Sequence, residues 1–271
     1  LERMISKISV IDRSKAGDSK LLIILMLGLR EKSWTKDDWK IVSEKEWIPT
    51  KAGQLRTPKS ALAHTKDVAR IIGDMDLPNL IDDSTVGEEL AQTIENSTIE
   101  DMARLGLRSE LTLLEMLKAW KHFMERGASP PNELFDRLES SYNKYSDELA
   151  TISPDNYKYF LDGKWLKPRS VVSGKPDGLP PNLKSAFHFT DSHPRLLKWL
   201  RREMQKNGPP TLSCFDVLDV LALNPLQEGH ALIWQYVVDR WETLGHAEKT
   251  SFKDAKLVDF KGTLFSPSKI I

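Results

Sequence analysis

Gly163-Lys164-Trp165-Leu166-Lys167-Pro168-Arg169-Ser170 is a short phrase that occurs in three related copies along the chain. Each copy has a glycine, four residues, a proline, and then a small basic or hydroxyl pair. The other copies occupy residues 53–60 and 262–269, so the spacings between glycines are 110 and 99 residues. Such spacings predict an internal repeat whose unit is a whole module of about a hundred residues rather than one turn of a solenoid.

Each copy is expected to form a small β-hairpin. Strand-like stretches precede the glycines at 46–50, 157–161 and 256–260, and Asp162-Gly163 is a strong two-residue turn signal. Proline cannot donate a hydrogen bond to a ladder, so it belongs at the end of the second strand. The predicted turn formers are Gly53, Gly163 and Gly262, and the predicted strand terminators are Pro58, Pro168 and Pro267.

Helices are expected between the hairpins. Amphipathic patterns precede the three hairpins at roughly 18–30, 131–149 and 228–244. Thr112 and Ser213 each stand three residues before an acid and directly before an apolar run, which is the pattern of a capped helix start. These two caps are 101 residues apart, so the helices belong to the same repeat as the hairpins.

The sequence therefore predicts an α+β fold that is predominantly helical, with hairpins near 46–62, 156–172 and 256–271. The expected organisation has the end of a preceding helical module at 1–45 and the start of a third module at 255–271. Two repeat modules, 46–152 and 153–254, lie between them.

Composition gives little direct information about chemistry. The chain has 271 residues, 39 basic and 39 acidic side chains, and hence no net formal charge that would attract nucleic acid or an anionic membrane. The single Cys214 excludes an internal disulfide framework and favours a reducing, intracellular compartment, cytoplasmic or nuclear.

The longest apolar run, 21–27, is shorter than a membrane span of about 20 residues, so no membrane contact is expected. The first residue is Leu1 and the third hairpin phrase is at the other end, so we expect a piece of a longer polypeptide.

Local motifs of catalysis and cofactor binding are absent from the sequence. It contains no Walker loop, no dinucleotide fingerprint and no nucleophile elbow. His188 and His193 flank an aspartate but lack a third metal ligand, and the acids near Asp74 do not follow the calcium-loop pattern. We therefore predict no catalytic residue, no cofactor and no metal site, and we interpret Cys214 as a core residue.

Basic and aromatic side chains are the remaining candidates for contact with a partner. One set surrounds the second hairpin, and the other surrounds a helix that contains Trp199. A groove lined by basic hairpins could bind phosphates. Alternatively, lysines on edge strands prevent pairing with the strands of other chains. The eight tryptophans are interpreted mainly as core anchors. The candidate contact residues are Lys164, Trp165, Lys167, Arg169, Lys198, Arg201, Arg202 and Lys206.

The hairpin phrases resemble a motif of very large proteins related to sacsin and to the plant protein NO VEIN. The resemblance is carried by Glu46 to Gly53 with Pro58, by Asp162 to Pro168, and by Leu105-Gly106-Leu107-Arg108 with the capped helix from Thr112. It implies a region downstream of a GHKL-type ATPase module, in chaperone-like or genome-defence proteins. The ATPase motifs themselves are absent from this sequence, so no residue here is expected to bind ATP.

Three functional hypotheses follow. The first is a non-catalytic scaffold or protein-interaction repeat region of a large multidomain ATPase, whose partner is a protein or another module of the same chain. The second is a nucleic-acid-binding region of a defence protein that uses the basic hairpins. The third is an enzyme with a dispersed active site, which would leave no local motif.

Overall fold

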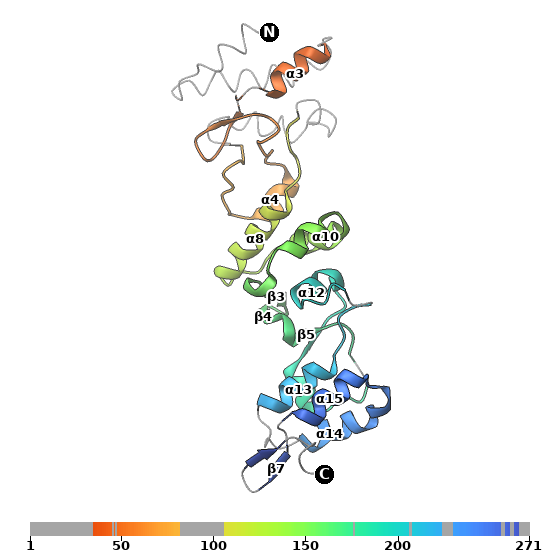
Figure 1. Ribbon diagram of the computed structural model, residues 1–271. Helices are drawn as coiled ribbons and strands as arrows, with labels where there is room; N and C mark the ends of the chain where they lie inside the picture. The colour runs from red at the N-terminus through yellow and green to blue at the C-terminus, as the bar shows by residue number, and fades with distance from the viewer. Residues whose placement is uncertain are drawn as a thin grey trace. The chain divides into compact units, whose positions relative to one another are not determined.

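A computed structural model describes residues 35–44, 46, 48–81, 106–175, 177–205, 208–223, 230–255, 258–260 and 263–265. The described fold is mixed α+β and predominantly helical, which confirms the predicted class. The chain divides into two compact units, Leu1–Leu134 and Phe135–Ile271. Figure 1 labels elements of both units, beginning with α3 (Lys36–Glu44), and its colours follow the chain from the N-terminus to the C-terminus.

All three predicted hairpins are present as antiparallel strand pairs. They are β1 (Ile48–Pro49) with β2 (Leu55–Arg56), β3 (Tyr159–Leu161) with β4 (Lys164–Leu166), and β7 (Val258–Phe260) with β8 (Thr263–Phe265). The second and third have the same register, because Leu161 pairs with Lys164 and Phe260 with Thr263 across two-residue loops. The loop of the first is one residue longer, since the Thr50 N–H donates to the Gln54 carbonyl at 3.1 Å.

Positive φ angles close the described turns. Asp162 has φ 50° and Gly163 has φ 75°, the two left-handed residues of a type I′ turn. Gly53 has φ 69° in the first hairpin, whereas Gly262 lies outside the described residues. Strands β2 and β4 each end two residues before a proline, Pro58 and Pro168; Pro267 also lies outside the described part.

The segment after each proline forms the same structure in both repeats. The Ser60 N–H and hydroxyl both donate to the Thr57 carbonyl at 3.0 Å, and those of Ser170 donate to the Lys167 carbonyl at 2.9 and 2.8 Å. In the second repeat this turn is the 3-10 helix η3 (Pro168–Ser170). The chain then enters a short buried strand.

In the first unit that strand is centred on Leu62, which is fully buried. Leu62 forms parallel bridges with both Leu80 and Arg108. The Ala63 N–H donates to the Arg108 carbonyl at 2.8 Å, and the Ile81 N–H donates to the Leu62 carbonyl at 3.0 Å. Three chain segments are thereby joined through one short strand.

In the second unit the equivalent strand is β5 (Val171–Val172), which pairs in parallel with β6 (His188–Phe189). On its other side the Ser173 N–H donates to the Pro210 carbonyl at 2.8 Å. Ser173 follows Ala63 by 110 residues, so the same backbone bond recurs at the same point of the repeat.

Helices follow the strands in a repeated order. The first unit has α4 (Lys66–Ile72) and α8 (Leu113–Glu125), which pack together. The following elements are α9 (Asn132–Ser140), α10 (Tyr142–Thr151) and the 3-10 helix η2 (Pro154–Asn156). The second unit continues with α11 (Pro181–Ala186), α12 (Pro194–Leu200), α13 (Cys214–Leu223), α14 (His230–Asp239), η4 (Trp241–Thr243) and α15 (His246–Asp254).

Two expected helices differ from their sequence prediction. The pattern at 131–149 is two helices, because the chain breaks at Ser141, where φ is −89° and ψ is 1°. The pattern at 228–244 ends as a helix at Asp239 and continues as η4, and the Leu232 side chain on α14 is 55% exposed. The pattern at 18–30 lies outside the described residues.

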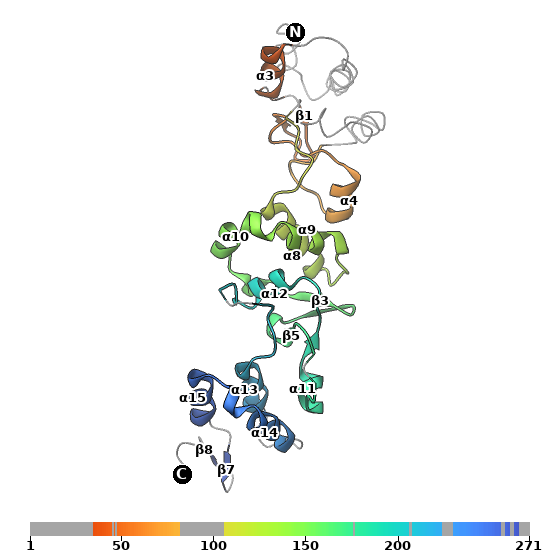
Figure 2. The same cartoon turned by 90° about the vertical axis from the view of Figure 1, so that its right-hand side faces the viewer.

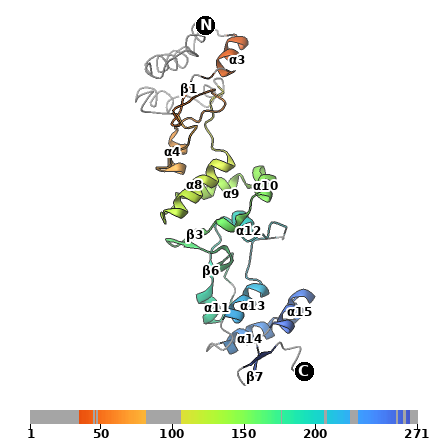
Figure 3. The same ribbon diagram turned by 60° about the vertical axis from the view of Figure 1, so that its left-hand side comes forward.

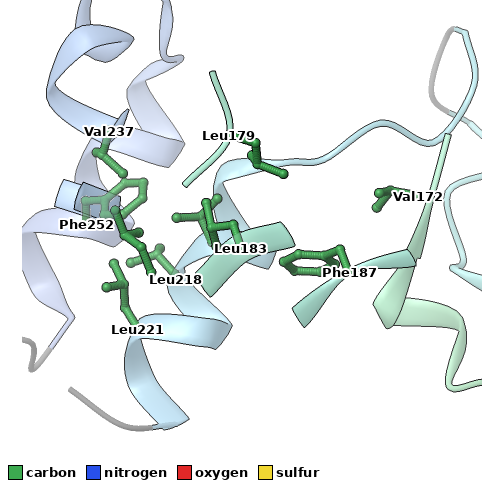
Figure 4. Packing of buried hydrophobic residues seen from close by; sticks show 10 residues of the cluster. Val172, Leu179, Leu183, Phe187, Leu218, Leu221, Val237 and Phe252 are labelled. Atoms are coloured by element: carbon green, nitrogen blue, oxygen red, sulfur yellow. The ribbon is translucent and has the colours of Figure 1, made fainter. Parts of the chain in front are cut away.

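The core of the second unit is built where α11, α13, α14 and α15 meet. Figure 2 shows α13, α14 and α15 gathered together, and α11 contacts both α13 and α14. Figure 4 shows side chains such as Leu183, Leu218 and Phe252 directed toward one another, with Phe187 extending the cluster toward Val172 of β5. The strand after the hairpin is thus joined to the helical core by apolar packing.

The compact units and the repeats are out of phase. The order hairpin, buried strand, capped helix and two further helices recurs from β1 to α10 and from β3 to α15. The border between the compact units falls inside α9 instead. The boundaries 46–152 and 153–254 therefore stay a prediction about sequence repetition.

Two glycines with positive φ should differ in their tolerance of alanine. A Cβ at Gly163 would meet nothing within 4 Å, so Gly163→Ala should cost only the backbone strain, about 1–2 kcal/mol. A Cβ at Gly73 would lie 3.0 Å from Phe123 Cζ, so Gly73→Ala should cost more. Urea unfolding measures the free energy of unfolding of both variants. Gly163→Asn is the matched control, because asparagine tolerates a positive φ. Equal losses of unfolding free energy in the two alanine variants would contradict the packing argument.

Candidate interaction sites

The structure places four of the candidate contact residues around the second hairpin. Lys164 and Lys167 are exposed, and Trp165 is half-buried with its ring 5.1 Å from that of Phe160. Arg169 follows in η3 with an 83% exposed side chain, and its Nη1 lies 3.3 Å from a carboxylate oxygen of Asp219. These residues form an exposed basic and aromatic region.

The second set of candidates does not form such a surface. Lys206 lies outside the described residues, and Lys198 is half-buried. Arg202 has a positive φ of 60°, closes the end of α12, and is paired with the Asp155 carboxylate. Its backbone position and its ion pair both serve the fold.

Arg201 is not available for contact with a partner, so its prediction as a contact residue requires correction. Its side chain is 2% exposed, and Nη2 donates to both carboxylate oxygens of Asp216 at 2.8 Å. Nη1 donates to the carbonyls of Arg169 and Val171, each at 3.0 Å. The guanidinium therefore connects the start of β5 to α13.

Asp216 is also the third residue of α13, the helix whose cap the sequence predicted at Ser213. The Ser213 N–H and hydroxyl donate to Asp216 Oδ2 at 2.8 and 2.7 Å, and the Asp216 N–H donates to Ser213 Oγ at 3.3 Å. This reciprocal arrangement is a capping box in which aspartate takes the place of the usual glutamate. One buried carboxylate thus accepts hydrogen bonds from a helix cap and from a buried arginine.

The first unit contains the same arrangement. Thr112 caps α8, and its N–H and hydroxyl donate to Glu115 Oε2 at 2.8 and 3.0 Å. Arg108 donates to the two Glu115 oxygens at 3.0 and 2.9 Å, and Asn79 Nδ2 donates to Oε1 at 2.8 Å. Arg108 is also the residue whose backbone pairs with the buried strand at Leu62.

The pKa of Glu115 reflects this arrangement. Burial acts to raise its pKa, but the hydrogen bonds from Arg108 and Thr112 and the charge of Arg108 outweigh it. The net effect is a pKa below the ordinary value of 4.5. The ionised carboxylate is the form that the folded first unit requires.

His193 was considered as a metal ligand in the sequence, and the structure gives it other partners. Its Nε2 lies 2.8 Å from Asp136 Oδ1, and its Nδ1 lies 3.3 Å from the Tyr159 hydroxyl, which donates to the Ser192 carbonyl at 3.0 Å. Tyr159 is 1% exposed, and burial raises its pKa to about 12. This chain of contacts holds α9, β3 and the start of α12 together.

The acids considered for calcium also have partners within the first unit. Asp74 accepts a contact from His122 Nε2 at 3.1 Å and one from Arg126 at 2.5 Å; these two hydrogen bonds lower the pKa of Asp74. Asp76 pairs with Lys51 at 2.9 Å. Asp82 and Asp83 lie outside the described residues.

The described tryptophans divide into core and surface positions. Trp120 and Trp199 are 0% and 1% exposed, and Trp199 Nε1 donates to the Leu149 carbonyl at 2.9 Å. Trp165, Trp234 and Trp241 are half-buried. The ring of Trp199 is therefore a core anchor and cannot serve as a stacking platform.

Within the part of the chain that the structure describes, no group of three or more histidine, cysteine, aspartate or glutamate side chains could hold a metal ion. Among the same residues, no helix has both the length and the apolar character needed to cross a membrane.

Sequence reasoning found both capped helices but missed the arginines that hold them. Arg108 stands four residues before Thr112, whereas Arg201 stands twelve before Ser213, so a search at fixed repeat spacing cannot align them. The sequence signal that could have found these arginines is an acid at the third helical position together with a Leu-Arg dipeptide upstream, at 107–108 and at 200–201. Asn79 and Asp136 carry no local pattern at all.

Comparisons with protein families, with curated proteins and with solved structures yield no match to this chain.

Removing the buried guanidinium should strongly destabilise the second unit. Arg201→Met leaves the Asp216 carboxylate buried without its cation, a change that costs about 3–5 kcal/mol in comparable buried pairs. Arg169→Met, which breaks the exposed pair with Asp219, should cost less than about 1 kcal/mol. Urea unfolding followed by circular dichroism compares the two; similar losses would show that Arg201 is not a buried structural cation.

Acid should weaken the first unit through Glu115. Its folded pKa is lowered, so its contribution is fully present above the ordinary value of 4.5 and is lost as pH falls through the lower folded pKa. Between neutral pH and that window, the wild type should lose more unfolding free energy than Glu115→Gln. Glu125→Gln, at a 61% exposed position, is the control and should follow the wild type.

Proposed function

We propose that this chain is a non-catalytic repeat region that scaffolds a larger protein and binds a protein partner. The observation that carries the proposal is the recurrence of one polar frame, a capping box whose acid is held by a buried arginine, in two consecutive repeats. The ion pairs Arg108–Glu115 and Arg201–Asp216 join elements of the fold to one another. We therefore look for the partner contact among the exposed side chains.

Exposed apolar side chains at equivalent positions support a protein partner. Among the described residues four large apolar side chains are exposed: Leu114, Phe215, Leu232 and Val238. Leu114 and Phe215 both occupy the second helical position of a capped helix, 101 residues apart, with 60% and 46% exposure. We interpret an apolar side chain that is exposed at the same place in two repeats as a point of contact with a protein partner.

The resemblance to sacsin-like proteins agrees with this role. In this proposal the chain is a region downstream of a GHKL-type ATPase module in a large chaperone-like or defence-related protein, as the resemblance implies. An intracellular location, cytoplasmic or nuclear, goes with the proposal because the chain has a single cysteine.

Photo-crosslinking tests the proposed protein contact. A photoreactive phenylalanine analogue is placed at Leu114 or at Phe215 in the full protein in its own cells, and Lys184, exposed on α11, is the control position. We expect Leu114 and Phe215 to crosslink to the same protein species and Lys184 not to do so. Crosslinks equal to the control at both positions would contradict the proposal, as would ATP- or metal-dependent turnover abolished by one substitution.

A further inference from the structure

The outward face of the second hairpin combines aromatic rings with lysines. In the β3–β4 ladder Tyr159 pairs with Leu166, and Tyr159 is buried against Phe135 with ring planes 4° apart. Successive side chains on a strand point to opposite faces, so Phe160 and Trp165, the next pair, point away from that core. Their half-buried rings meet edge to face at an interplanar angle of 62°.

Two lysines continue this face. Extending the ladder by one residue beyond Tyr159 and Leu166 places Lys158 opposite Lys167, and both side chains are exposed. Two positive charges on one face of a hairpin create a local positive potential that attracts an anionic ligand. We name these four residues, Lys158, Phe160, Trp165 and Lys167, the β3–β4 outer face.

The hairpin frame does not require these side chains. The third hairpin has the same register and loop length, yet Asp259 and Leu264 occupy the positions of Phe160 and Trp165. The residues that flank its ladder in sequence are Leu257 and Ser266, where the second hairpin has the two lysines. Because the same backbone forms without the aromatic and lysine pairs, those pairs are specific to the second hairpin.

The surroundings of the outer face favour an anionic ligand. Exposed Lys164 stands at the turn, and Arg169, which pairs with Asp219, follows in η3; Asp162 is the one acid in the sequence between residues 157 and 169. Figure 3 shows the hairpin extending to the side of α12, and the turn residues Asp162 and Gly163 are exposed. Flat rings next to clustered cations match a ligand that carries both aromatic bases and phosphates.

We propose that the β3–β4 outer face binds single-stranded nucleic acid. Bases stack on the Phe160 and Trp165 rings, and Lys158 and Lys167 neutralise neighbouring phosphates. A single strand is preferred to a duplex because its bases can leave their own stack and meet an aromatic side chain. An acidic peptide would use the lysines alone and would leave the aromatic pair without a role.

Fluorescence anisotropy with a labelled oligothymidylate tests the proposal on the intact chain. If Lys158, Lys167 and the turn residue Lys164 each contact a phosphate, affinity should fall by roughly tenfold between about 50 mM and about 200 mM salt. A duplex of equal length and an oligoglutamate peptide are the competing probes. We expect the unlabelled single strand to displace the probe at concentrations at least about tenfold lower than either competitor.

Substitutions separate the charge from the stacking contribution. Lys158→Ala/Lys167→Ala should weaken binding about tenfold and reduce the salt dependence, since two phosphate contacts are lost. Trp165→Leu should weaken binding about tenfold with the salt dependence unchanged, and Trp165→Phe should retain most of the affinity. Lys184→Ala, an exposed lysine of the same unit, is the matched control.

Three results would overturn the proposal: no single-strand binding at low salt, binding that the outer-face variants do not change, or equal competition by oligoglutamate. A thermal melt of each variant establishes that the second unit is folded, and Trp165→Phe keeps the stacking question testable where Trp165→Leu lowers stability. The outer face does not include Leu114 or Phe215, so failure here leaves the proposed protein contact standing, and the reverse also holds.

Discussion

The buried contact between an arginine and the acid of a helix cap is the interaction on which the described structure depends. In each repeat a carboxylate that is less than a tenth exposed must be compensated, and the arginine that compensates it also bonds to the strand after the hairpin, Arg108 through its backbone and Arg201 through its guanidinium. Desolvating such a charge is costly unless hydrogen bonds satisfy it, so cap, strand and helix have to form together. The hairpin is then fixed in position by the strand that follows it.

The two repeats achieve this contact in different ways. In the first, Arg108 supplies both the guanidinium and the backbone that pairs with the buried strand. In the second, the Pro210 carbonyl accepts the backbone hydrogen bond from the strand, and Arg201, at the end of α12, supplies the guanidinium that pairs with Asp216. A proline offers a carbonyl but no side-chain donor, so a cation has to come from another segment. The geometry is kept although the residues that make it are not at equivalent positions.

This difference explains how far the sequence could predict the structure. Hairpins and helix caps are local, because a Gly at positive φ or a hydroxyl three residues before an acid acts within a few residues; both classes of prediction were confirmed in the described residues. The partner of a buried acid is not local. Arg201 looks like a surface cation in sequence, between Leu200 and Arg202, and only its burial against Asp216 shows its structural role. The split of the helix predicted at 131–149 has no proline or glycine at Ser141 to indicate it.

Structural residues and candidate functional residues differ in whether they recur at the same place in the repeats. A side chain that recurs at one place in the frame, such as the capping hydroxyl, is explained by folding. A side chain that differs between two repeats of the same geometry is not explained by folding. The second and third hairpins allow this comparison, because they have the same strand register but different outward-facing residues. Leu114 and Phe215 are a third case, because they recur and yet remain exposed, so the frame repeats them without using them. In the two proposals made above, the exposed residues that recur are contacts made by every repeat, whereas the exposed residues that vary are contacts made by one.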